Sequence, residues 1–254
     1  MKRTACLVSM AALCCLSGTA FTQDDGSAVG YAYVTYFECD AGREYRADEI
    51  IELNFKPHYD AAVKAGDIAQ WSWLTHFVGG KWRRALVLTA GNMDDLLASA
   101  GALGEALEST TPAAGRDFTS ICPIHEDYIW QTVPGTGSDI GAERGSVGFS
   151  VYMKCDVNRE DRADEIIRET LGPIYDAQIE SGGFVGWNWL AHNVGGDFRR
   201  LLSVTGVDHN TVMAARAAVL DEVRTGRSNR AFEQLNDICP DHHDYMWDIR
   251  FETP

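Results

Sequence analysis

Apolar residues change their spacing several times along the chain, and each change predicts a new element. Residues 29–38 are apolar and aromatic with β-branched members, which predicts a strand. The next segment repeats apolar residues at helical spacing. The predicted helix face comprises Ala47, Ile50, Ile51, Asn54, Phe55 and His58 and, further along the chain, Ala163, Ile166, Ile167, Thr170, Leu171 and Ile174. Pro57 and Pro173 lie inside this pattern and should kink or split the helix.

The elements that follow are predicted at residues 70–78 (strand), 82–89 (strand), 92–108 (helix) and 125–133 (strand). Gly79-Gly80 joins the first two strands, because glycine permits the positive φ angles of a tight hairpin. Asn92 is a plausible N-cap for the helix, and a further short helical turn is expected to end at Cys122. The order β-α-β-β-α-β is that of a ferredoxin-like unit.

The whole pattern occurs twice. Residues 46–51 (RADEII) return at 162–167, and residues 71–76 (WSWLTH) return as WNWLAH at 187–192, a spacing of 116 residues (162 − 46). Cys122 returns as Cys239, one residue further on. A repeat of this length indicates two copies of a small domain, since solenoid repeats span roughly 20–50 residues. The chain is therefore a tandem duplication.

The first residues have the features of a secretory signal peptide. Lys2 and Arg3 precede an apolar run, and the small residues at 18–20 suit cleavage. The run is shorter than the roughly 20 apolar residues of a membrane-spanning helix, so no membrane anchor is predicted. We expect a signal peptide at residues 1–20, one repeat at 29–133, a Gly-rich polar linker at 134–146, a second repeat at 147–251, and a periplasmic or extracellular location.

Four cysteines remain after removal of the signal peptide: Cys39, Cys122, Cys155 and Cys239. Three pairings are open, and duplication favours one bridge within each repeat, Cys39–Cys122 and Cys155–Cys239. Right-handed crossovers also bring the end of the first strand beside the start of the last, where these cysteines lie. A zinc-thiolate site is the alternative, but it lacks the Cys-x-x-Cys spacing.

Charge narrows the range of partners. The net charge is −15, and removal of Lys2 and Arg3 with the signal peptide leaves −17. Such acidity argues against a nucleic-acid partner, whereas a cationic partner stays open.

The duplicated element order and the Trp-rich second strand resemble the dimeric α/β-barrel superfamily, with a layout similar to antibiotic-biosynthesis-monooxygenase-type proteins. The resemblance covers residues 29–133 and 147–251. It implies an α+β fold in which two ferredoxin-like units pack sheet to sheet, so that a monomer acts as a pseudo-dimer. The superfamily includes cofactor-free monooxygenases, haem-degrading enzymes, relatives of haem-dependent chlorite dismutase and isomerases, so fold alone does not choose a function.

Candidate chemistry centres on the second strand of each repeat, where alternate residues share a face. If the tryptophan face points inward, the barrel gains an aromatic lining for a ligand. The residues of this lining are Trp71, Trp73, Trp187 and Trp189. If the opposite face points inward, His76 and His192 are candidate catalytic bases. Arg84 and Arg200 are candidates for holding a carboxylate or enolate, although pairing with acidic side chains is the simpler interpretation.

Other patterns are weaker. His125-x-Asp127 and His242-x-Asp244 supply metal-ligand types, but they come from different repeats, and no metal is predicted. His58 is a candidate haem ligand whose counterpart, Ile174, favours a packing role. Polarity also changes between Phe77 and Asn193 and between Lys81 and Asp197. These differences predict one working cavity or asymmetric halves.

The resulting hypothesis is an exported protein that binds a small hydrophobic or aromatic molecule in an aromatic-lined cavity. The alternatives are a cofactor-independent monooxygenase or isomerase and, third, a haem-binding protein; no cofactor is predicted. Catalysis requires a pocket lined by His76 or His192. The sequence has no nucleophile, phosphate-loop or metal motif, which favours binding.

Overall fold

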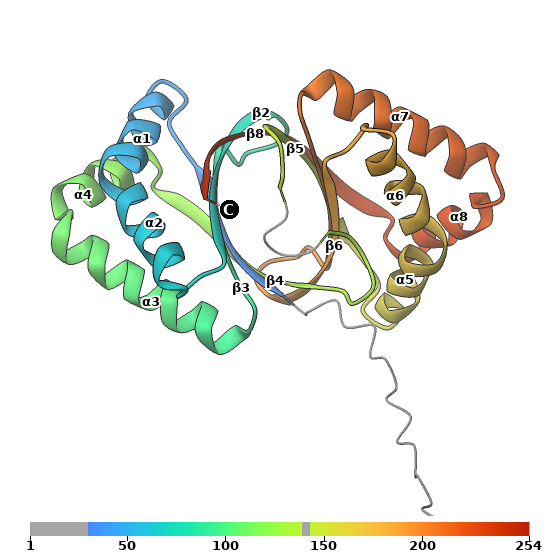
Figure 1. The fold of residues 1–254 in the computed structure, drawn as a ribbon, viewed down its shortest axis with the longest axis horizontal. Coiled ribbons are helices and arrows are strands. Elements are labelled where there is room, and N and C mark those ends of the chain that lie inside the picture. The colour runs from blue at the N-terminus through green and yellow to red at the C-terminus, as the bar shows by residue number, and fades with distance from the viewer. Residues whose placement is uncertain (1–29, 139–142, 254) are drawn as a thin grey trace, which may run out of the picture.

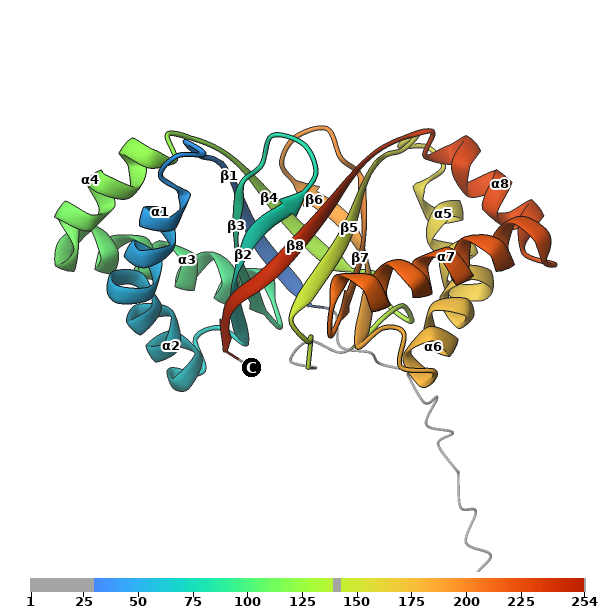
Figure 2. The same cartoon turned by 90° about the horizontal axis from the view of Figure 1, so that it is seen from above.

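In the computed structural model, which describes residues 30–138 and 143–253, eight antiparallel strands form one closed barrel with helices on two opposite sides (Figures 1 and 2). The first repeat contains β1 (Tyr31–Glu38), α1 (Glu44–Ile50), η1 (Ile51–Phe55), α2 (Lys56–Ala65), β2 (Gln70–Val78), β3 (Arg84–Ala90), α3 (Met93–Thr110), α4 (Pro112–Ile121) and β4 (Ile124–Thr132). The second contains β5 (Val147–Lys154), α5 (Glu160–Ile166), η2 (Ile167–Leu171), α6 (Gly172–Glu180), β6 (Gly186–Val194), β7 (Arg200–Gly206), α7 (His209–Thr225), α8 (Asn229–Ile238) and β8 (Asp241–Thr253). The predicted signal peptide lies outside the described residues.

The barrel is built from the sheets of the two repeats. Its strand order is β1-β3-β2-β8-β5-β7-β6-β4, so each repeat keeps its four strands together. The sheets are joined at both edges, where β2 pairs with β8 and β4 pairs with β6. Helices α1–α4 cover the outer face of the first sheet and α5–α8 that of the second (Figure 1). A single chain thus forms the α+β pseudo-dimer expected from the repeat.

The long helix of each repeat contains a π-helical turn immediately before its proline-bearing segment. These turns are η1 and η2, and the prolines at positions 57 and 173 follow in α2 and α6. A proline has no N–H to donate and its ring crowds the carbonyl four residues earlier. The prediction that the helix would be split is confirmed, and the split is a widened turn.

Local sequence signals also hold elsewhere. Asn92 caps α3, and its side chain accepts a hydrogen bond from the Asp95 N–H. Gly79 has φ 151°, and a Cβ at this position would lie 2.4 Å from the Tyr245 ring, so the hairpin needs glycine there. The bridges join Cys39 to Cys122 and Cys155 to Cys239, as expected from the repeat.

Buried side chains form three clusters. Each repeat has one cluster between its sheet and its helices, and the third cluster fills one end of the barrel interior. The aromatic members of this third cluster are Tyr36, Trp82, Tyr128, Trp130, Tyr152, Phe198, Tyr245 and Trp247. None of the described helices is long and apolar enough to cross a membrane.

Candidate functional site

The tryptophan pairs of β2 and β6 lie on the helix side of the sheets. Trp71 donates a hydrogen bond to Asp60 of α2 at 2.9 Å, and Trp73 donates one to Asp48 of α1 at 2.8 Å. The second repeat has the same bonds, Trp187 to Asp176 and Trp189 to Asp164, both at 2.7 Å. The four indoles therefore fasten helices to sheets, and they line neither of the two cavities described below. The aromatic residues inside the barrel come from other positions.

Arg84 and Arg200 are buried in matching ion pairs. Arg84 Nε donates to Asp48 Oδ1 at 2.7 Å and Nη2 donates to Asp48 Oδ2 at 2.9 Å, a two-bond pairing. Arg200 pairs in the same way with Asp164 at 2.7 and 2.8 Å. Each guanidinium is thus neutralised by a carboxylate of its own repeat. A ligand-binding role for Arg84 and Arg200 stays a prediction.

His76 and His192 line neither cavity. The Nδ1 atom of His76 accepts a hydrogen bond from Arg83 Nη1 at 2.9 Å, and its ring packs edge-on against Trp247. Burial, and secondarily the neighbouring Arg83 guanidinium, lower the pKa of His76 below its ordinary value of 6.5. His192 has the same environment next to Arg199, with the same causes for a lowered pKa. Both imidazoles are therefore neutral at neutral pH.

The weaker candidates are not assembled into a site. His125 lies 3.3 Å from Asp127, and His242 lies 3.6 Å from Asp244, with both imidazoles exposed. Residues 30–138 and 143–253 contain no group of three or more metal-ligating side chains. His58 is half-buried and shares a hydrogen bond with Thr110 at 3.2 Å.

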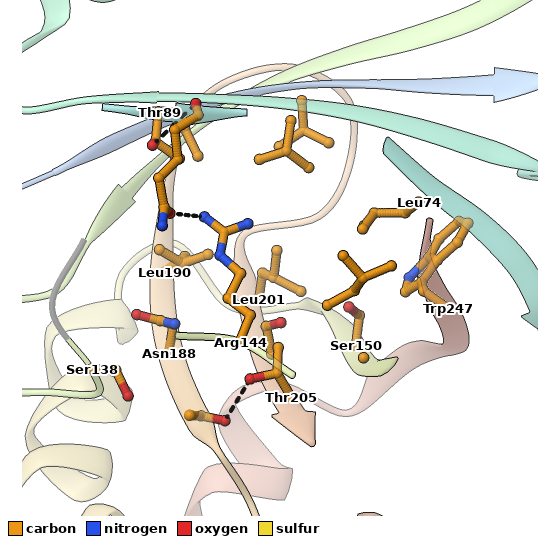
Figure 3. A pocket seen from close by; sticks show the side chains of 18 of the residues that line it. Leu74, Thr89, Ser138, Arg144, Ser150, Asn188, Leu190, Leu201, Thr205 and Trp247 are labelled. Carbon is orange, nitrogen blue, oxygen red and sulfur yellow. Dashed lines mark hydrogen bonds between the residues drawn. The ribbon is translucent and has the colours of Figure 1, made fainter. Parts of the chain in front are cut away.

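The first cavity lies inside the barrel, borders the aromatic cluster through Tyr36, Tyr152 and Trp247, and has a volume of about 150 Å³. Figure 3 shows Arg144 reaching into it, with Asn188 and Leu190 on one side and Leu74 and Trp247 on the other in this view. Arg144 belongs to the predicted linker. The described part of this segment therefore contributes to the barrel interior.

The second cavity lies in the second repeat, between the outer face of the sheet and helices α6–α8, and has a volume of about 460 Å³. Its walls are mainly apolar. The apolar lining includes Phe149, Val151, Met153, Ile167, Leu171, Phe184, Leu202, Val204, Val219, Leu220, Val223, Phe232 and Leu235. We call this space the sheet–helix cavity. Two of its lining residues, Ile167 and Leu171, come from the π-helical turn η2, a feature that often marks functional sites.

The equivalent space of the first repeat is occupied by phenylalanine. Phe118 of α4 packs edge-on against Phe37 at 5.2 Å between ring centroids, and Phe55 lies 5.8 Å from it. At the matching positions the second repeat has Met153 (for Phe37), Leu171 (for Phe55) and Leu235 (for Phe118). Phe232 replaces Gly115 nearby, yet the cavity persists. Three smaller side chains thus line the open volume at positions where the first repeat has phenylalanine.

Polar groups are concentrated at a few points of the sheet–helix cavity. The Arg216 guanidinium lies 4.6 Å from the centre of the Phe149 ring, and its Nη2 is 3.4 Å from Asp244 Oδ2. Arg224 and His242 also line the cavity. Burial raises the pKa of Tyr175 to about 12, so its hydroxyl is protonated at neutral pH. The cavity therefore combines apolar walls with two guanidinium groups.

No family model matches the sequence, and no curated protein matches it. Solved structures do match. A candidate monooxygenase from Fusobacterium nucleatum subsp. nucleatum has a TM-score of 0.59 and 11% identity, with 89% of this chain and 94% of that chain covered. An anthrone oxidase-like protein has a TM-score of 0.55 and 14% identity, with 89% of this chain and 93% of that chain covered. A candidate chlorite dismutase has a TM-score of 0.51 and 11% identity, with 88% of this chain and 95% of that chain covered. These similarities, with the closed barrel, decide the fold.

The chain has the dimeric α/β-barrel fold in one polypeptide. At these identities the likeness shows the fold and not the activity. The site residues of this dimeric α/β barrel must come from its own geometry. Sequence reasoning missed Arg144, Arg216 and the Met153–Leu171–Leu235 set. The signal for the last set was present, since the three phenylalanines are lost between aligned repeats.

Proposed function

We propose that the protein binds a small apolar molecule with a negatively charged group in the sheet–helix cavity of the second repeat. One observation carries the proposal. A space of about 460 Å³, within the range of small-molecule sites, lies in the second repeat, where three phenylalanines of the first repeat are replaced by smaller residues. Closely packed interiors ordinarily contain few voids larger than a water molecule. A space this large in one repeat is therefore best explained by a ligand.

The walls set the first property of the ligand. Side chains from β5, β7, α7 and α8 present aliphatic and aromatic groups to the cavity. Transfer of apolar surface from water to such walls contributes roughly 25 cal/mol per Å² of ligand surface buried. A hydrocarbon chain or an aromatic ring fits this environment.

The guanidinium groups set the second property. The corresponding positions of the first repeat are Ala100 (for Arg216) and Glu108 (for Arg224), so the positive charge is specific to the second repeat. Arg216 has one acidic partner, Asp244, at 3.4 Å, and Arg224 forms no ion pair with the described residues. Carboxylates and phosphates bind arginine through paired hydrogen bonds. These two residues therefore favour an anionic ligand despite the acidity of the chain.

The same lining supports binding more than catalysis. His76 and His192, the candidate bases, lie outside the cavity. Tyr175 is protonated at neutral pH and acts as a hydrogen-bond donor rather than a base. The predicted haem ligand His58 lies in the first repeat, where phenylalanines pack in the equivalent space, and it does not line the sheet–helix cavity.

Isothermal titration calorimetry with decanoate and with decan-1-ol tests the proposal. We expect decanoate to bind once per chain and decan-1-ol to bind at least about tenfold more weakly, because it lacks the charge. The double substitution L171F/L235F copies the first repeat and should abolish both interactions. Arg216→Gln should weaken the binding of decanoate but not the binding of decan-1-ol. The matched control is Leu53→Phe, at an exposed position of η1. Decanoate binding that survives L171F/L235F unchanged, or no binding to the unaltered protein, would overturn the proposal.

We also infer that the protein acts outside the cytoplasm. Its two disulfides support this location, since such bonds persist in oxidising compartments. Expression of the full chain in a bacterium should yield periplasmic protein whose mass lacks residues 1–20. Full-length protein in the cytosol would contradict the inference.

A further inference from the structure

We infer that the barrel interior holds a second, separate binding site, for a small aromatic carboxylate with a single ring, and that Arg144 binds its carboxylate. This inference is independent of the sheet–helix cavity, which lies on the outer face of the sheet. It rests on a charged side chain in a confined space whose direct partners are neutral.

Arg144 is the cationic group of this site, and the neighbouring Glu143 also lines the cavity but forms no ion pair with Arg144 among the described residues. Its Nη1 donates to Ser72 Oγ at 2.6 Å, and its Nη2 donates to Gln70 Oε1. A guanidinium has five N–H donors, and the other three have no acceptor among the described residues. Burial lowers the pKa of Arg144, and Glu252 opposes this effect without forming an ion pair with it. A guanidinium with donors to spare and no bonded carboxylate is suited to an anion.

The remaining lining suits one ring. Leu74, Leu190 and Leu201 contribute apolar surface, and Trp247 supplies an aromatic wall (Figure 3). The volume of about 150 Å³ is of the order known to accommodate one benzene molecule in another protein. The indole N–H of Trp247 is buried without a hydrogen-bond partner among the described residues. Its indole lies near Tyr152, where it lowers the pKa of the Tyr152 hydroxyl against the larger, raising effect of burial. A ligand oxygen would satisfy it.

The repeat symmetry limits this site to one per chain. At the positions that match Gln70 and Arg144, the other repeat has Gly186 and Ala28. The second repeat also places Ser150 and Ser203 where the first has Val34 and Val87, all four in the cavity wall. The lining of the barrel interior thus differs between the two sides of the pseudo-twofold axis, and the Arg144 site occurs once.

Calorimetric titration with benzoate and with benzyl alcohol tests the inference. Benzoate should bind once per chain, and benzyl alcohol at least about tenfold more weakly. Arg144→Gln should weaken benzoate at least about tenfold, and Arg144→Lys should weaken it less. Ser203→Leu should abolish benzoate binding by filling the cavity, and it keeps the inference testable if Arg144→Gln does not fold. Retained decanoate binding in these variants shows that they are folded.

The variant L171F/L235F distinguishes the two sites. It should leave benzoate affinity unchanged, whatever its effect on decanoate. Loss of benzoate binding in this variant would place benzoate in the sheet–helix cavity and overturn the inference. Equal benzoate affinity in Arg144→Gln and the unaltered protein would overturn it as well, as would an absence of binding at millimolar benzoate.

Discussion

The two repeats share their hydrogen-bonded framework and differ in how they fill it. Both fasten their helices to the sheet with two Trp–Asp hydrogen bonds and one buried Arg–Asp pair, with nearly equal distances. Both close one disulfide across almost the same length of chain. Between sheet and helices, however, one repeat packs phenylalanines and the other leaves about 460 Å³ open. Directional bonds maintain the fold in both copies, so the packing of one copy was free to diverge.

Removal of either disulfide should have the largest effect, and the two effects should be equal. The bridges span 83 and 84 residues, for which the chain-entropy model gives about 4–5 kcal/mol each. We expect C39S/C122S and C155S/C239S to lower the free energy of unfolding by similar amounts in urea titrations. A difference of more than about 2 kcal/mol between the variants would mean that the framework is not shared equally.

Breaking the buried ion pair should distinguish the repeats. Asp48 is 1% exposed and Asp164 is 13% exposed, and each neutralises an arginine that is almost fully buried. An asparagine keeps the acceptor for the tryptophan but leaves the guanidinium with a single carboxylate partner, Glu44 for Arg84 and Glu160 for Arg200. We expect Asp48→Asn to cost about 3 kcal/mol, and Asp164→Asn to cost less. Urea unfolding measures both, and the reverse order would contradict the tighter packing assigned to the first repeat.

Exchange of packing residues should have smaller effects of opposite sign. Phe118→Leu opens space in the first repeat and should destabilise the protein by about 1–2 kcal/mol. Leu235→Phe fills space in the second repeat and should stabilise it by about 0.5–1 kcal/mol. Thermal unfolding of the two variants without ligand measures both changes in stability. If Leu235→Phe destabilises the protein as much as Phe118→Leu does, the sheet–helix cavity cannot accommodate the larger side chain, and the prediction is wrong.

Protonation of His76 and His192 should have the smallest effect on the free energy of unfolding, and the effect should be the same in both repeats. In the unfolded chain, His76 and His192 bind protons near pH 6.5, whereas burial lowers both pKa values in the folded protein. The unfolded state therefore binds more protons as pH falls below 6.5, and their contribution lowers stability until the folded pKa is reached. We expect H76N/H192N, which keeps an acceptor for each arginine, to lose less stability than the unaltered protein between pH 7.5 and 5.5. Identical pH profiles in urea unfolding would show that these histidines do not contribute.

Most of the fold could be predicted from the sequence because each element has its own apolar period and occurs twice. The strand predicted at residues 70–78 matches β2, and the helix predicted from Asn92 matches α3. The cysteine pairing followed from the repeat. The closure of both sheet edges followed only from the family resemblance, since strand periodicity does not report which edges pair.

The site was harder to predict for physical reasons. Alternation shows that Trp73 and His76 lie on opposite faces, but it does not say which face meets the helices. A cavity depends on the summed volume of residues from several elements, so no single position among Met153, Leu171 and Leu235 predicts it. Arg144 lies in a segment with linker composition, and only the folded chain shows that its side chain enters the barrel.

The most direct test of the account is a crystal structure of the protein grown with decanoate. We predict one decanoate per chain in the second repeat, with its hydrocarbon chain between β5, β7 and α7 and its carboxylate within hydrogen-bond distance of Arg216 or Arg224. The phenylalanine-filled space of the first repeat should be empty of ligand. Decanoate bound equally in both repeats, or only outside the sheet–helix cavity, would contradict the claim that the second repeat has become the binding half.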